Sequence, residues 1–162
     1  MSSPEHKAYI WNLIKNIEVG MLVTQDEDAS TIRSRPMHLV QDAYDGTLYF
    51  FTPKSDAKVY EIRDERDVCI TFSDIQKQIY ISLSGQASLS TDRELIDKYW
   101  NSWVAQWFEG GKDDPEVSVL AIKIHKGEHW NAENNKAIQF IKMAKAKAMD
   151  ETPDLVENKS FG

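Results

Sequence analysis

The sequence has a single cysteine among its 162 residues, so it cannot form an internal disulfide. Cys69 lies among Val68, Ile70 and Phe72, a setting typical of a packed strand rather than of an exposed, reactive thiol. The first residues, MSSPEHKAYIWNL, lack the basic and apolar regions of an export signal. Since a reducing compartment also fits this cysteine usage, we expect a cytoplasmic protein.

The sequence also lacks a long apolar run and an excess of positive charge. No run approaches the roughly 20 apolar residues that a bilayer requires, and the formal net charge is -7. This acidic balance opposes binding to nucleic acid and to anionic membranes, so neither partner is expected. His38, His125 and His129 lack cysteine or carboxylate neighbours at metal-binding spacing, so no metal site is expected.

Apolar residues, 41% of the chain, can supply one core, and short apolar runs predict the strands around it. Asp45-Gly46 provides the positive φ of a tight hairpin, so neighbouring strands are expected to be antiparallel. Six strands in one domain favour a barrel or a sandwich. They are expected at Met21–Thr24, Thr31–Val40, Thr47–Thr52, Val68–Phe72, Ile79–Leu89 and Val117–Ile124.

Helical periodicity predicts four helices, at residues 5–17, 55–63, 92–108 and 132–149. Ser55 and Thr91 are the expected caps of the second and third. The third carries Trp100, Trp103 and Trp107 at helical spacing, which favours a core or interface role over ligand stacking. We expect one domain over residues 1–149, followed by a frayed polar tail over 150–162.

Two arginines mark the second predicted strand. Arg33 and Arg35 are two residues apart, so their side chains project from the same face, and guanidinium groups suit phosphate oxygens. Pro36 has no backbone N–H and therefore indicates a sheet edge or a bulge. The competing interpretation, which these residues alone favour, is a solvated arginine pair on an exposed face.

A second basic segment, Thr52–Lys58, leads from a strand into a helix start. Exposed N–H groups and the helix dipole attract anions there. The dipole disfavours Lys58 in the first turn, and a bound phosphate would reverse that effect. Solvation of Lys54 and Lys58, offset by Asp56, is an equally weighted alternative.

Together these segments resemble the pyridoxamine 5'-phosphate oxidase-like FMN-binding split barrels, in particular the general stress protein 26 branch. The resemblance covers most of the chain and implies a mainly β fold with flanking helices, a six-stranded antiparallel split β-barrel. The motifs that carry it are R-P-M at 35–37, D-G-T-L-Y-F-F-T at 45–52, Ser55 with Lys58, S-G-Q-A at 84–87, W-F-x-G-G-K-D-D-P at 107–115 and E-H-W at 128–130.

The resemblance implies an FMN site at the interface of a homodimer. Arg35 and Lys58 would hold the flavin phosphate with help from Ser55. The backbone near Met37 and at Phe51–Thr52 would line the isoalloxazine ring, and Trp130 would come from the second subunit. The full set of expected cofactor-binding residues is Arg33, Arg35, Pro36, Met37, Phe51, Thr52, Ser55, Lys58 and Trp130.

The sequence departs from the oxidase where that enzyme grips its substrate. The oxidase has an arginine-x-histidine element after its tryptophan, whereas this chain reads N-A-E-N-N-K-A-I-Q from Asn131, and Val40 replaces a lysine. Oxidation of pyridoxamine 5'-phosphate is therefore not expected, and no catalytic residue is assigned. The expectation is an FMN-binding general stress-type protein, either a flavin-dependent oxidoreductase or a non-enzymatic flavin carrier. FAD, deazaflavin and pyridoxal phosphate remain alternative ligands.

Overall fold

The computed structural model describes residues 4–25, 30–56, 66–132, 143–149 and 156–161. A short helix also covers residues 143–148. In chain order, the other elements are α1 (Pro4–Ile14), β1 (Val19–Gln25), β2 (Ile32–His38), β3 (Thr47–Pro53), β4 (Arg66–Asp74), β5 (Ile79–Ser90), α3 (Arg93–Tyr99), α4 (Ser102–Ala105), the 3₁₀ turn η1 (Gly111–Asp113), β6 (Val117–Ala132) and β7 (Val156–Phe161). None of the helices in these ranges is both long and apolar enough to cross a membrane.

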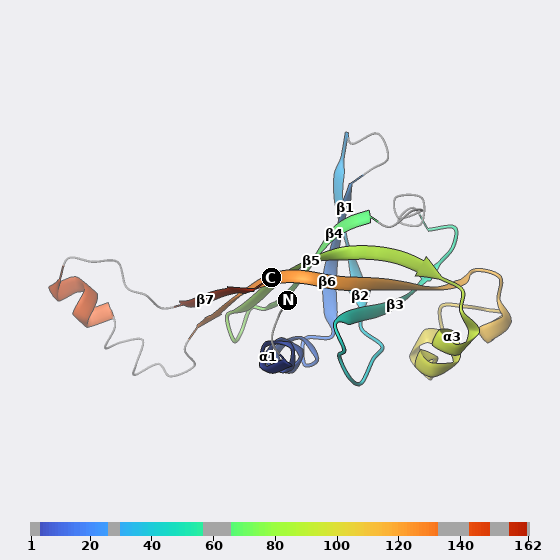
Figure 1. Cartoon of the computed structure of the whole chain (residues 1–162), viewed down its shortest axis with the longest axis horizontal. Coiled ribbons are helices and arrows are strands. Elements are labelled where there is room, and N and C mark those ends of the chain that lie inside the picture. Colours follow the sequence, from blue (N-terminus) through green and yellow to red (C-terminus); the bar gives the residue numbers. More distant parts are fainter. Residues whose placement is uncertain (1–3, 26–29, 57–65, 133–142, 150–155, 162) are drawn as a thin grey trace.

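The strands form one antiparallel sheet in the order β2-β1-β4-β5-β6-β3, with β7 added to β6 (Figure 1). The sheet curves until its two edge strands, β2 and β3, contact each other without hydrogen-bonding as neighbours. Because adjacent strands alternate in direction, the start of β2 and the end of β3 lie at the same end of the sheet. This arrangement brings Arg33 near the start of β2 and Lys54 after the end of β3 to one end of the sheet.

The main core follows from strict alternation along the strands, which buries every second side chain. In β3 the inward residues are Leu48, Phe50 and Thr52, all fully buried. Helix α1 covers the interior of the curved sheet with Ile10 and Ile14. Fully burying such an aliphatic side chain contributes about 1.5–3 kcal/mol, so α1 is a firm part of the fold.

A second, smaller core attaches α3 and α4 to the sheet. Ile96, Val104 and Phe108 pack on Val117 and Val119 of β6. This cluster fixes the α3–α4 segment beside the edge strand β3, and Figure 1 shows α3 at the end of β6 far from β7. The segment therefore forms a wall next to the split in the sheet.

The predicted antiparallel split barrel with flanking helices is confirmed, and the six expected strands are all present. The strand count is corrected to seven, because residues 156–161 form β7 instead of a frayed tail. Phe161 anchors β7 by packing against the main core. Residues 157–160 of the strand are all polar, so the sequence shows no apolar run that would predict a strand there. The expected domain boundary at residue 149 stays a prediction.

Strand β6 continues to Ala132, well past the expected end at Ile124, as a ribbon between β5 and β7. The expected helix over 132–149 is found at residues 143–148, since Ala132 belongs to β6 and residues 133–142 lie outside the described ranges. Gly46 has the predicted positive φ of 115°, but no hairpin follows, because β2 and β3 are opposite edges.

The single helix expected over 92–108 is wrong, since α3 and α4 are separated by an extended residue, Trp100. The side chain of Asn101 starts α4 by accepting a hydrogen bond of 2.9 Å from the Val104 N–H. The cap of α3 is Asp92, which accepts from the Glu94 N–H at 3.0 Å, and not the expected Thr91. The break turns Trp103 of α4 toward His38 of β2.

Candidate functional site

The guanidinium group of Arg35 is held half-buried on β2. Its Nη2 donates to Thr24 Oγ1 on the adjacent strand at 3.1 Å. Strand alternation places Arg33 on the same face, where it is exposed. A guanidinium that is partly withdrawn from water interacts more strongly with an anion than a solvated one does. Arg35 is therefore the better candidate of the two for a phosphate.

An apolar pocket of about 210 Å³ lies where edge strands β2 and β3 meet, and we call it the β2–β3 pocket. Both strands and the α4 segment contribute to it, through Pro36, Met37, His38, Phe51, Pro53, Trp103, Val104, Trp107 and Phe108. Of the nine residues expected from the sequence, Pro36, Met37 and Phe51 thus line one cavity. Its aromatic and apolar walls suit a planar ring.

Thr52 lies between the pocket residues Phe51 and Pro53 on β3, but its side chain points to the opposite, inward face of the strand. It is fully buried there, and its Oγ1 has no hydrogen-bond partner among the described residues. A buried hydroxyl without a partner costs about 1–3 kcal/mol. The apolar pocket and the half-buried cation of Arg35 on β2 together fit a ligand that has a planar ring and an anionic group, as a phosphorylated flavin does.

Ser55 is exposed in the turn that follows β3, and its donors are engaged by a carboxylate. The Ser55 N–H and Oγ–H donate to the same oxygen, Oε2 of Glu116, at 2.9 and 2.6 Å. These two hydrogen bonds lower the pKa of the Glu116 carboxyl. The site expected to receive a phosphate is therefore occupied by an anionic group of the chain itself.

Trp130 is not brought to the β2–β3 pocket, and Lys58 lies outside the described residues. Trp130 is eleven positions along β6 from Val119, the residue paired with Phe51, which at 3.3 Å per residue is about 36 Å. Within one chain, Trp130 cannot reach a ligand in this pocket.

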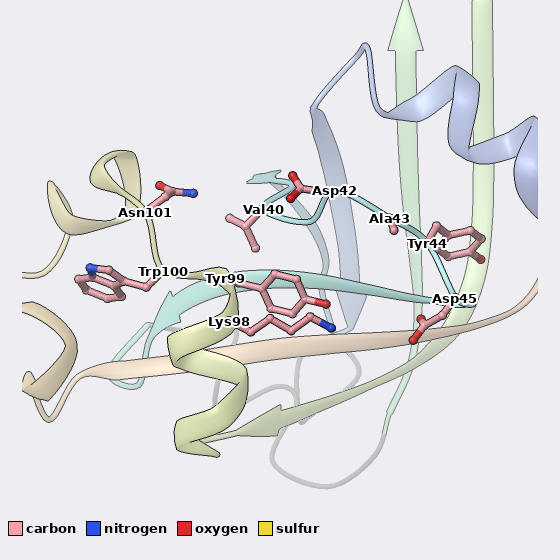
Figure 2. Close-up of a pocket in the computed structure, with 9 residues that line it drawn as sticks. All are labelled: Val40, Asp42, Ala43, Tyr44, Asp45, Lys98, Tyr99, Trp100 and Asn101. Carbon is pink, nitrogen blue, oxygen red and sulfur yellow. The ribbon is translucent and has the colours of Figure 1, made fainter.

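A separate pocket of about 440 Å³ lies between the loop 40–45 and the end of α3 (Figure 2). Lys98 and Tyr99 extend from α3 toward the loop that carries Asp45. Burial and the neighbouring Asp45 charge raise the pKa of Tyr44 to about 12. Because Asp42 and Asp45 outnumber the single Lys98 cation, this pocket disfavours a phosphate.

Six residues of the β2–β3 pocket are not among the site residues expected from the sequence: His38, Pro53, Trp103, Val104, Trp107 and Phe108. The sequence favours a core or interface role for Trp103 and Trp107, and it offers His38 only as a metal ligand. Trp103 is 39% and Trp107 67% exposed, so neither is a core residue of this chain. The position of His38 directly after Met37 was a usable signal, whereas the break at Trp100 that orients the tryptophans left no clear one.

The fold and the pocket together define an open antiparallel split barrel with a cavity between its edge strands. The chain belongs to the Pyridoxamine 5'-phosphate oxidase like family, whose model matches residues 5–154. It is 30% identical to General stress protein 26 from Bacillus subtilis over 130 residues, which are 76% of this chain and 86% of that protein. The predicted family is thus confirmed.

Two solved structures have the same architecture. A structure assigned to general stress protein 26 from Jannaschia sp. CCS1 covers 98% of this chain and 99% of its own, with a TM-score of 0.77 and 28% identity. The general stress FMN/FAD binding protein from Xanthomonas citri covers 82% of this chain and 93% of its own, with a TM-score of 0.72 and 28% identity. The chain spans about half of another relative, Protein bli-3 from Neurospora crassa, with 30% identity over 65% of this chain and 54% of that protein.

Proposed function

We propose that this chain binds FMN in the β2–β3 pocket and acts as a flavin-dependent oxidoreductase of the general stress type. One observation carries the proposal: Met37 from β2 and Phe51 from β3 line a single apolar cavity, with the half-buried cation of Arg35 two residues before Met37. The flavin-binding description of the Xanthomonas citri protein supports the choice of cofactor.

In this proposal the chain's own residues bind and orient the cofactor. Arg35 would neutralise the phosphate together with Lys58, the backbone at Phe51 and Thr52 would lie along the ring, and Met37 and Trp103 would exclude water from its faces. When bound, the flavin supplies the electron-transfer chemistry, so no acid–base pair of side chains is required.

We also propose that the working form is a homodimer. The β2–β3 pocket, at about 210 Å³, is smaller than the roughly 300–1,000 Å³ typical of ligand sites, so one chain encloses part of a flavin. Trp130, too distant within its own chain, completes the site from a second copy. The helix at 143–148 stands apart from the sheet in Figure 1 and exposes about half of the Met143 side chain, which suits packing on that copy.

A non-enzymatic flavin carrier is the second candidate. The segment after Trp130 lacks an arginine that could grip an anionic substrate, and this feature favours binding without turnover. The two candidates share the cofactor and differ in whether the bound flavin exchanges electrons with a second molecule.

The test begins with mass spectrometry of the small molecule that co-purifies with the protein and with its visible absorption spectrum. FMN in the spectrum and in the mass analysis supports the proposal, and a purified dimer that refuses added FMN would overturn it. Oxidation of NADH or NADPH, followed at 340 nm, then separates the oxidoreductase from the carrier. A loaded protein that neither accepts electrons from these donors nor passes them to oxygen or a quinone favours the carrier.

A further inference from the structure

Glu116 is fastened to the turn after β3 in two independent ways. Its backbone is held by the Lys54 N–H, which donates to the Glu116 carbonyl at 2.9 Å, and by its own N–H, which donates to Asp114 Oδ1 at 2.9 Å. Its side chain makes separate bonds to Ser55. The carboxylate can therefore leave Ser55 by rotating its side chain while the loop stays attached.

The hydrogen bonds of Ser55 are incompatible with simultaneous binding of a phosphate. A serine hydroxyl has one proton to donate, and its backbone N–H has another. Both are directed at Glu116 Oε2. A phosphate dianion has only acceptor oxygens, so Ser55 cannot donate to it until Glu116 withdraws. A phosphate beside Ser55 would also be repelled by the Glu116 carboxylate.

We infer that Glu116 is a built-in competitor of the ligand's phosphate and sets how strongly the site prefers phosphorylated over unphosphorylated flavin. The inference rests on the proposed FMN site, with Ser55 beside the phosphate as the family resemblance implies, and adds a residue that opposes binding. Ser55 is available to phosphate when the Glu116 side chain swings away, and it returns to Glu116 when the ligand leaves. The cost of displacing this carboxylate reduces affinity for FMN and leaves affinity for riboflavin unchanged.

A structural clasp is the competing explanation, in which Glu116 only joins the start of β6 to the end of β3. The two explanations predict different ligand preferences. The clasp predicts that loss of the carboxylate lowers the stability of the fold, or lowers the affinities for FMN and riboflavin equally. Competition predicts a selective gain for FMN, because riboflavin has the same ring and no phosphate.

The experiment compares dissociation constants of FMN and riboflavin for the full-length wild type and Glu116→Gln, with Glu109→Gln as the matched control. Glu109 is exposed on the same loop, so its replacement removes one negative charge without touching Ser55. Competition predicts that Glu116→Gln raises the preference for FMN over riboflavin roughly tenfold, about the effect of one charge-assisted hydrogen bond. Glu109→Gln should change it less than twofold.

Riboflavin affinity shows whether each variant retains a folded pocket. An FMN preference in Glu116→Gln that equals that of Glu109→Gln, or falls below that of the wild type, would overturn the inference while the proposed FMN site stands. A wild type and variants that bind neither flavin overturn the proposed function and the inference with it. In a Ser55→Ala background, Glu116→Gln should raise the preference for FMN by a smaller factor, because the Ser55 hydroxyl donor is gone. An increase as large as in the Ser55 protein again contradicts competition.

Discussion

Trp103 of α4 stacks on His38 of β2, with ring centroids 4.2 Å apart and 28° between the ring planes. His38 Nε2 also lies 3.8 Å from Oε2 of Glu18, the residue directly before β1. This stack attaches the α4 segment to an edge strand of the sheet. It also closes one side of the β2–β3 pocket.

Replacing Trp103 with alanine should open this pocket and weaken flavin binding about tenfold, because the ligand loses an aromatic wall. Trp103→Phe, which keeps an aromatic ring, should lower the flavin affinity threefold at most. Quenching of flavin fluorescence on titration gives both affinities. Equal binding by wild type and Trp103→Ala would place the flavin elsewhere.

Arg35→Met should weaken FMN binding about 10- to 100-fold, because a charge-assisted hydrogen bond contributes about 1.5–3 kcal/mol. Riboflavin affinity should stay within twofold of the wild type. Arg93→Met is the control, since Arg93 is an exposed arginine on α3 that pairs with Asp97 and Asp113. Calorimetric titration with both flavins checks the result, and a parallel loss of riboflavin binding would show that Arg35 supports the fold instead of the phosphate.

The proposed shared site predicts complementation between two defective variants. Arg35→Met and Trp130→Ala should each lose FMN binding at both sites of a homodimer. When the two are co-expressed and subunits pair at random, half of the dimers are mixed and each contains one intact site, so about a quarter of sites recover. Bound flavin per protein, measured by absorbance on the purified dimer, tests this. No recovery in verified mixed dimers would show that Trp130 acts within its own chain or has no role.

Gly85→Ala should lower the free energy of unfolding by about 1–3 kcal/mol, as expected for overpacking. Gly85 lies at the bulge where β5 shifts register against β6, and a Cβ there would overlap the Lys123 carbonyl oxygen of the neighbouring strand. Urea unfolding followed by tryptophan fluorescence gives the value. Ser84→Ala, one residue earlier, should change stability by less than 1 kcal/mol, and similar losses in both variants would argue against a close backbone approach.

Acid should destabilise the loop that presents Glu116. The Glu116 and Gly110 N–H groups lower the pKa of Asp114 below its ordinary value of 3.8, and Ser55 lowers that of Glu116 below 4.5. Both carboxyl groups have a lower pKa in the folded protein than in the unfolded chain. Their ionised forms therefore stabilise the fold above the unfolded pKa values, and this stabilisation is lost as the pH falls through the lower pKa values of the folded protein. The melting temperature should therefore fall steadily from about pH 4.5 downward. Asp114→Asn should have a lower melting temperature than the wild type at pH 7, and its melting temperature should fall less in acid. If the melting temperature of the variant fell with pH as steeply as that of the wild type, Asp114 would not be a source of the acid sensitivity.

The strands of the main core could be predicted from sequence because one face of each is buried. In β3, for example, Leu48 to Phe51 form a continuous apolar run, and the structure buries Leu48 and Phe50 fully. The second half of β6 gave none, since Lys126 and Glu128 face outward and the ribbon is held by backbone pairing with β5 and β7. Hydrogen bonds between polar strands leave little trace in composition.

Only part of the candidate site could be predicted from the sequence, because its residues come from segments that are far apart in the chain. The grouping of Arg35 and Met37 with Phe51 came from a resemblance to a family, since no local rule shows that two edge strands close upon each other and bring together residues 14 or more positions apart. The bond between Ser55 and Glu116 joins residues 61 positions apart and depends on how β3 pairs with β6. The path of Trp103 to His38 depends on the Asn101 cap that starts a second helix.

Pro36 and Pro53 each remove one backbone donor from the two strands at the limits of the sheet. Free strand edges are templates for uncontrolled addition of further chains, and a proline interrupts the row of donors that such growth requires. The barrel can therefore remain split, with room for a ligand, without becoming a nucleus for fibrillar aggregation. Replacing either proline should increase aggregation before it lowers the stability of the fold.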